Sequence, residues 1–186
     1  MSGPARRAAV TLREVTADTV CDVCRLNVAP EQQAFVAPNA ISIAQAYFEP
    51  AAWFRAVYAD DAPVGFVMLY DPTPMSALDR PQARIAPKRP RAEGGQVSAL
   101  EAGPDTCFLW RFMIDREHQG RGYGAAALDL VIAHARTLAG VARMKTSYVP
   151  QPGNASPLYE RAGFRATGQV DDGEHVLALE FARPPA

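Results

Sequence analysis

The sequence lacks the features that mark membrane, secreted and nucleic-acid-binding proteins. It has no run of about 18 apolar residues, the length with which a helix crosses a bilayer. The arginines near its start are not followed by the apolar core of about 7–15 residues that a secretion signal needs. The net charge is −1 and 48% of the 186 residues are hydrophobic, which excludes a polycation and a disordered acidic chain. We therefore expect one cytoplasmic domain over residues 1–186, without membrane or nucleic-acid partners.

Cysteine is also scarce, and this limits the metal and redox chemistry of the chain. Cys21 and Cys24 form a C-x-x-C pattern, but a zinc ribbon needs a second pair, and the third cysteine, Cys107, lies alone in a predicted strand. Residues 16–27 are typical of a helix on which Val20 and Cys24 share one face. We interpret the two cysteines as small apolar helix residues, and we expect no metal site.

Residues 107–140 have the composition of a buried strand, a polar turn with three alternate glycines, and an amphipathic helix. Two known nucleotide-binding patterns do not fit this segment. The P-loop pattern G-x-x-x-x-G-K-[ST] is absent. A Rossmann site needs a glycine directly after the strand and an acidic residue about 20 positions later, and neither is present. Backbone N–H groups at a helix start favour an anion, and glycine lets the anion approach closely. A phosphate-bearing ligand is predicted here, with a ligand-free glycine turn as the alternative.

Residues 119–124, QGRGYG, resemble the Q/R-x-x-G-x-G/A pattern of the GCN5-related N-acetyltransferases, the GNAT superfamily. The resemblance implies that the loop amides hold the pyrophosphate of acetyl-coenzyme A, and that a side chain at position 124 would point into the phosphate space. It also implies a bulged strand before the loop, whose backbone binds the pantetheine arm. The residues implied in cofactor binding are Phe112, Met113, Ile114, Gln119, Gly120, Arg121, Gly122, Tyr123, Gly124 and Ala125.

A second motif, residues 152–164, has the composition of a short capped helix. Asn154 suits the N-cap, Pro157 is tolerated in the first turn, and Gly163 ends the helix. The segment is similar to the GNAT pattern N-x-x-[AS]-x-x-x-Y-x-x-x-G-F, with Tyr159 five residues after Asn154. The resemblance implies that Asn154 and Pro157 lie at the cofactor and that Tyr159 protonates the departing thiolate. The alternative for Tyr159 is a half-buried helix residue with a solvated hydroxyl.

The order of elements is that of an α/β (α+β) chain with the GNAT fold: a single mixed, mostly antiparallel twisted sheet flanked by helices, with a bulged central strand. Strands are predicted at residues 10–15, 53–58, 64–70, 108–114, 141–149, 164–170 and 175–181. Helices are predicted at residues 16–28, 42–48, 124–139 and 154–162, with a short turn or helix at 31–36.

A Pro-rich basic insertion at residues 71–106 departs from the family's short turn. It holds six of the 16 prolines and a basic run over residues 80–91. A structureless loop of this length is either functional or disordered. We expect a solvated, mobile loop or a dimer contact outside the cofactor site; a cover over the acceptor groove is the alternative.

The acceptor is predicted to be a small primary amine, most specifically a polyamine or diamine. Residues 31–39 and 42–46 resemble the bacterial spermine/spermidine branch of the GNATs. A polycation needs carboxylates and aromatic faces near the acetyl group, and the candidates are Glu31, Glu49, Asp71, Tyr47 and Trp53. The alternatives are a protein N-terminus or lysine, an aminoglycoside, or a non-catalytic acyl-coenzyme A-binding module. A homodimer is also expected.

The predicted mechanism is direct transfer within a ternary complex, without a metal. An ammonium with a pKa of about 10 must lose a proton before it attacks, and Glu31 or Asp71 is the candidate base through water. A backbone N–H of Met113 or Ile114 is the candidate group to polarise the thioester carbonyl. Tyr159 then supplies the proton to the thiolate.

Overall fold

The computed structural model describes residues 8–73 and 105–181, whose strands form one seven-stranded sheet. The order is β1-β2-β3-β4-β5-β7-β6, and every neighbouring pair is antiparallel except β4 and β5. The strands are β1 (Val10–Arg13), β2 (Ala52–Ala59), β3 (Ala62–Tyr70), β4 (Thr106–Ile114), β5 (Arg143–Tyr148), β6 (Arg165–Asp171) and β7 (Glu174–Glu180). The predicted fold class, a mixed and mostly antiparallel sheet with a bulged central strand, is confirmed.

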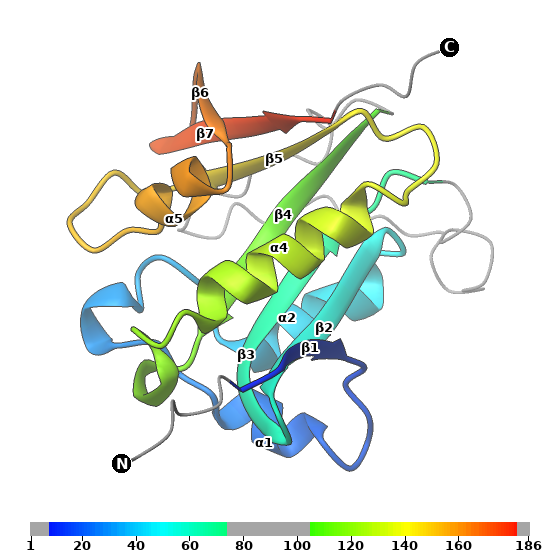
Figure 1. Cartoon of the computed structure of the whole chain (residues 1–186), viewed down its shortest axis with the longest axis vertical. Coiled ribbons are helices and arrows are strands. Elements are labelled where there is room, and N and C mark those ends of the chain that lie inside the picture. Colours follow the sequence, from blue (N-terminus) through cyan, green and yellow to red (C-terminus); the bar gives the residue numbers. More distant parts are fainter. Residues whose placement is uncertain (1–7, 74–104, 182–186) are drawn as a thin grey trace, which may run out of the picture.

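Helices cover both faces of this sheet (Figure 1). The helices are α1 (Val20–Arg25), α2 (Asn39–Phe48), α4 (Tyr123–Ala135) and α5 (Ser156–Arg161), with short 3-10 turns η1 (Pro30–Gln32) and η3 (Arg116–His118). Leu128 of α4 and Tyr159 of α5 belong to the core on one face, and Val23 of α1 and Ala46 of α2 to the core on the other. None of the helices in residues 8–73 and 105–181 is long and apolar enough to cross a membrane.

The bulge in β4 reverses which side chains face α4. Met68 of β3 pairs with Arg111 and the next residue, Leu69, pairs with Leu109, so Trp110 is the extra residue. Before the bulge, Leu109 packs in the α4-side core; after it, Phe112 does so instead. Trp110 packs in the core on the opposite face. One inserted residue therefore shifts the alternation of side chains between the two faces by one position in the last part of β4.

The N-terminal helices differ from their predicted bounds for tertiary reasons. Helix α1 ends at Arg25 because the next segment turns to β4, where the Asp115 carboxylate accepts the N–H of Asn27 at 2.8 Å. Helix α2 begins at Asn39, before residue 42, where the helix was predicted to begin. The Asn39 side chain is 2% exposed and donates to the carbonyl oxygen of Val23 at 2.8 Å. A buried hydrogen bond between α1 and α2 thus determines where α2 begins.

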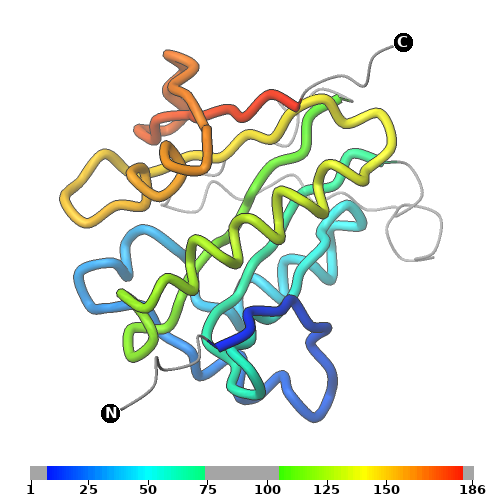
Figure 2. Tube along the Cα trace, viewed as in Figure 1, coloured from blue at the N-terminus to red at the C-terminus, as the bar shows by residue number. Residues whose placement is uncertain are grey.

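Three loops meet at one end of the sheet. Figure 2 shows the segments near residues 28–38, 115–122 and 149–155 side by side along one edge of the molecule. The opposite end of β3 and β4 is where Tyr70 pairs with Phe108 and the chain enters the predicted insertion. Most of that insertion, residues 74–104, lies outside the described residues.

Candidate active site

Strands β4 and β5 run side by side for four residues and then separate. Thr106–Leu109 pairs in parallel with Arg143–Thr146, and the Thr146 hydroxyl donates to the Leu109 carbonyl at 3.3 Å. β4 continues to Ile114 and β5 to Tyr148 without further pairing. The carboxyl ends of parallel neighbours are where ligands bind in α/β sheets.

The free edge of β4 carries the backbone groups of two residues. The N–H of Asp115 donates to Val64 of β3 at 2.8 Å. Hydrogen-bonded pairs alternate along an antiparallel ladder, so Met113 pairs with Phe66 while the backbone groups of Phe112 and Ile114 point toward β5. The Gln119 side chain donates to the Ile114 carbonyl at 2.9 Å, as this orientation requires. Of the two amides considered for the thioester carbonyl, that of Ile114 faces the gap.

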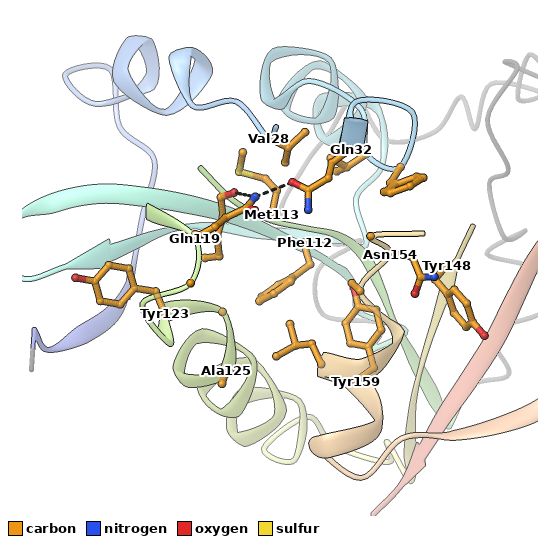
Figure 3. Close-up of a pocket in the computed structure, with 18 of the residues that line it drawn as sticks. Val28, Gln32, Phe112, Met113, Gln119, Tyr123, Ala125, Tyr148, Asn154 and Tyr159 are labelled. Atoms are coloured by element: carbon orange, nitrogen blue, oxygen red, sulfur yellow. Dashed lines mark hydrogen bonds between the residues drawn. The ribbon is translucent and has the colours of Figure 1, made fainter. Parts of the chain in front are cut away.

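A cavity of about 480 Å³ occupies this gap (Figure 3). Both faces of the sheet contribute to it: Tyr159 comes from the α4 side, and Gln32 and Met113 from the side of α1 and α2. The predicted site residues that line it are Phe112, Met113, Ile114, Gln119, Gly120, Gly122, Tyr123, Gly124, Ala125, Asn154 and Tyr159. The predicted residues outside its lining are Glu31, Arg121 and Pro157, which are exposed.

The glycine loop presents an open helix start to the cavity. Gly120 and Gly122 have φ of 74° and 83°, the left-handed region where glycine alone is unstrained, and a Cβ there would meet nothing within 4 Å. The first intrahelical bond runs from Ala126 to Gly122 at 3.2 Å. The N–H groups of Tyr123, Gly124 and Ala125 thus lack helical acceptors, and these residues line the cavity. This arrangement suits an anion.

Gly124 serves a different purpose from the one predicted. A Cβ at this position would lie 3.6 Å from Ile114 and 3.6 Å from Leu158. Its side chain would therefore point toward β4 and α5, and not into free phosphate space. Both are ordinary van der Waals distances, so a Cβ would fit here, while the branches of a valine would meet both elements.

Gln119 braces the loops around the cavity. Its amide donates to the Gln32 side chain at 2.8 Å as well as to Ile114 (Figure 3). Gln32 in turn accepts the N–H of Ala29 at 3.3 Å. Arg121 instead donates to the Glu117 carbonyl at 2.9 Å on the exposed side of the loop. Gln119 thus fixes η1 against the end of β4.

Tyr159 is a buried phenol at the cavity wall. It is 5% exposed, and its ring centroid lies 6.5 Å from that of Phe112 and 5.7 Å from that of Phe164. Burial raises the pKa of Tyr159 to about 12; the Thr146 hydroxyl opposes the shift and the Glu174 charge adds to it. The phenol therefore stays protonated near neutral pH. Its alternative as a half-buried residue with a solvated hydroxyl does not match this burial.

Asn154 lies one residue before the N-cap of α5, which is Ala155 and not Asn154 as predicted. Its Oδ1 accepts the N–H of Ser156, the first helical residue, at 2.8 Å, and its Nδ2 donates to Gln151 at 2.6 Å. Pro157 lies in the first turn of α5, and Gly163 after the helix has φ of 101°. The motif thus forms a tight corner beside the cavity.

Several lining residues were missed by the sequence reasoning. Ser147 and Tyr148 end β5, and Phe35 and Val36 form an apolar wall after η1. The strand–helix–strand order of residues 108–149 could have identified the end of β5, because it predicts parallel neighbours with a shared ligand edge.

The arrangement of possible metal-ligating side chains is also defined in the described residues. Among residues 8–73 and 105–181, no group of three His, Cys, Asp or Glu side chains is arranged to hold a metal. Cys21 is exposed and Cys24 half-buried on α1, with both thiols free and Val23 between them in the core. This matches their interpretation as ordinary helix residues.

Comparison with known proteins decides the family. The model of the acetyltransferase (GNAT) family matches residues 22–164, which include the glycine loop, the diverging strands and Tyr159. The chain belongs to the GNAT family. As a GNAT protein it is an acetyl-coenzyme A-dependent N-acetyltransferase, and the open helix start at the cavity fits a pyrophosphate.

Individual relatives agree with this assignment. A spermine/spermidine N1-acetyltransferase of Bacillus subtilis is 25% identical over 92% of this chain and 99% of its own length. An acetyltransferase from Thermus thermophilus shares the fold with a TM-score of 0.61 at 18% identity, over 95% of this chain and all of its own. The aminoglycoside acetyltransferase AAC(6')-Ib, solved with coenzyme A, gives a TM-score of 0.65 at 15% identity, covering 92% of this chain and 95% of its own.

Proposed function

We propose that this acetyltransferase acts on a primary amine of a polyamine or diamine, by direct attack in a ternary complex. The observation that carries the proposal is the cavity through the gap between β4 and β5, lined from both faces of the sheet. Two substrates that enter from opposite faces meet in this gap, which supports transfer without a covalent enzyme intermediate. The full-length similarity to a spermine/spermidine acetyltransferase supports a polyamine.

Acetyl-coenzyme A is proposed to bind on the α4 side. Its pyrophosphate would lie on the N–H groups of residues 123–125, with Gly120 and Gly122 leaving room for it. The backbone edge of Phe112 and Ile114 would hold the pantetheine arm, since its orientation suits a strand-like partner. Asn154 lines the same cavity, whereas Arg121 and Pro157 lie outside its lining and would only flank the bound cofactor.

Tyr159 is proposed as the proton donor to the coenzyme A thiolate. Its position at the cavity wall supports this role, and the phenol holds its proton at working pH. The base is a separate question. Glu31 is exposed, whereas its neighbour Gln32 lines the cavity, so Glu31 would act only through water.

An acceptor screen tests the proposal. Purified protein and acetyl-coenzyme A are mixed with spermidine, spermine, a diamine, peptides with a free N-terminus or lysine, and an aminoglycoside, and thiol release is measured. We expect turnover with the polyamines. Turnover confined to a peptide or the antibiotic would reject the polyamine, and cofactor binding without any turnover would indicate a non-catalytic module.

The expected homodimer is a separate part of the proposal. Light scattering during gel filtration at several protein concentrations measures the mass directly. A mass of about 20 kDa at all concentrations, that of the 20.1 kDa chain, would reject it.

A further inference from the structure

A carboxylate that belongs to neither sequence motif lies directly behind a residue of the cavity wall on its second face. Ser147 lines the cavity at the end of β5, and its hydroxyl donates to Oε2 of Glu174. Glu174 is the first residue of β7, next to β5 in the sheet, where Tyr148 pairs with His175 and Ser147 with Val176. The carboxylate is thereby tied to the cavity wall from a position 27 residues along the chain.

Strand alternation places Glu174 on the face opposite α4. Met144 of β5 and Leu177 of β7 pack in the α4-side core. Ser147 and Glu174 are an odd number of residues from these, so their side chains lie on the face of α1 and α2. Acetyl-coenzyme A is proposed on the α4 side, so an acceptor that enters from the other face comes to Ser147, the residue hydrogen-bonded to Glu174.

The charges around Glu174 favour a cation. Asp171 and Asp172, in the β6–β7 hairpin, add negative charge, and Arg111 of β4 is the positive group facing it. Burial is the main cause that raises the pKa of Glu174; the two aspartates raise it further, and the Ser147 hydroxyl and Arg111 lower it. Glu174 also contributes to the raised pKa of Tyr159, so the two groups lie within electrostatic range. Among the charges that act on the Glu174 carboxylate, the two aspartates outnumber the one guanidinium.

We propose that Glu174 binds the reacting ammonium of the acceptor on the face opposite acetyl-coenzyme A and takes the proton that the amine must lose. Ser147 is its positioning residue. The inference rests on the proposed amine acceptor and names the acidic group that the sequence assigned to Glu31 or Asp71. The Asp71 carboxylate instead accepts two hydrogen bonds from Thr73 in the loop after β3, from the Thr73 N–H at 2.9 Å and from the Thr73 hydroxyl at 2.6 Å.

The proton balance of the step is complete with these residues. One proton passes from the ammonium to the Glu174 carboxylate, and the freed lone pair bonds to the acetyl carbon as the carbon–sulfur bond breaks. The sulfur takes the Tyr159 proton, and the second proton of the nitrogen restores the phenol. Glu174 then releases its proton to solvent, so each turnover yields one amide, one thiol and one proton.

The variant Glu174→Gln tests the inference, because an amide oxygen still accepts from Ser147 while the charge is removed. We expect kcat/KM for spermidine at pH 7 to fall roughly 10²–10⁴-fold. We expect spermidine affinity, measured by calorimetry with coenzyme A bound, to fall at least about tenfold. Affinity for acetyl-coenzyme A is expected to stay within about twofold, which checks the fold.

Two further measurements separate a chemical role from a structural one. Without the base, the variant depends on free amine, so its rate should rise steeply toward pH 10 and the deficit should shrink. Glu180→Gln is the matched control: it makes the same substitution at an exposed site at the other end of β7, and we expect at most about a threefold change.

The outcomes distinguish this inference from the proposed function. If the unmodified protein turns over spermidine and Glu174→Gln does so equally well and with equal affinity, the carboxylate only fastens β7 to β5 and the inference is wrong. If the unmodified protein turns over no amine, the proposed function fails and the inference with it. Glu174→Asp, which keeps the charge, should restore part of the lost affinity.

Discussion

Replacing Tyr159 with phenylalanine isolates the proposed proton donor from its structural role. The residue is 5% exposed, and its ring contacts with Phe112 and Phe164 do not involve the hydroxyl. The change removes one oxygen beside Thr146 and should alter the free energy of unfolding by about 1 kcal/mol at neutral pH. Affinity for acetyl-coenzyme A should remain.

The catalytic effect should be much larger than the structural one. Loss of a general acid costs roughly 10²–10⁴-fold in kcat, or about 3–5 kcal/mol of transition-state stabilisation. With a pKa of about 12, Tyr159 is protonated throughout pH 6–10, so the deficit should be the same across that range. Stopped-flow or steady-state thiol release measures it. A variant with wild-type kcat would refute the reasoning and leave thiolate protonation to water.

The same pKa predicts a loss of stability in alkali. The phenol ionises at about 10 in the unfolded chain and at about 12 in the folded protein, so the folded state holds the proton more tightly. Its contribution, roughly 3 kcal/mol, is present below pH 10 and disappears as pH rises from 10 to 12. Urea titrations of Tyr159→Phe should show no such loss in the free energy of unfolding between pH 10 and 12. Tyr58→Phe, a phenol 7% exposed on β2 away from the cavity, is the control and should retain it.

Three further predictions concern the loop, the insertion and the thiols. Gly122→Val should weaken acetyl-coenzyme A binding at least about tenfold by calorimetry. Gly140→Val is the control, because its φ of 78° and equally open surroundings give similar backbone strain, and its affinity should not change. Equal affinities in both variants would contradict the loop assignment. Joining Thr73 to Asp105 with a short turn should not change acetyl-coenzyme A binding, because Phe108, at the insertion end of β4, lies about 20 Å along the strand from Ile114 at the cavity. A folded variant that no longer binds would place the insertion in the cofactor site. A thiol reagent at pH 8 should modify exposed Cys21 but not Cys107, since burial raises the pKa of Cys107 to about 12; rapid modification of Cys107 in folded protein would show the strand to be open.

Much of the local structure of the candidate site could be predicted from the sequence, because it depends on residues close together in the chain. The glycine loop needs φ above zero at Gly120 and Gly122, and only glycine takes that conformation freely. The hydrogen bond that Asn154 accepts at the start of α5 comes from Ser156, two positions away. The hairpin at Asp172 and Gly173 likewise depends on neighbours, with φ of 47° and 84°.

The rest depended on contacts between distant residues. The register of β4 against β3 made Trp110 the bulged residue and turned the amides of Phe112 and Ile114 toward β5. Helix bounds at α1 and α2 followed from buried hydrogen bonds over long separations, which local propensity does not contain.

The acidic group that we propose for the acceptor side is the clearest case. Glu31 was favoured because it stands in the family-like segment, but η1 turns Gln32 and not Glu31 to the cavity. Glu174 has no local pattern around it, and only the pairing of β5 with β7 brings it to Ser147. Sheet pairing is non-local, so a residue's neighbours across strands are decided when the sheet forms and not by the residues beside it in the chain.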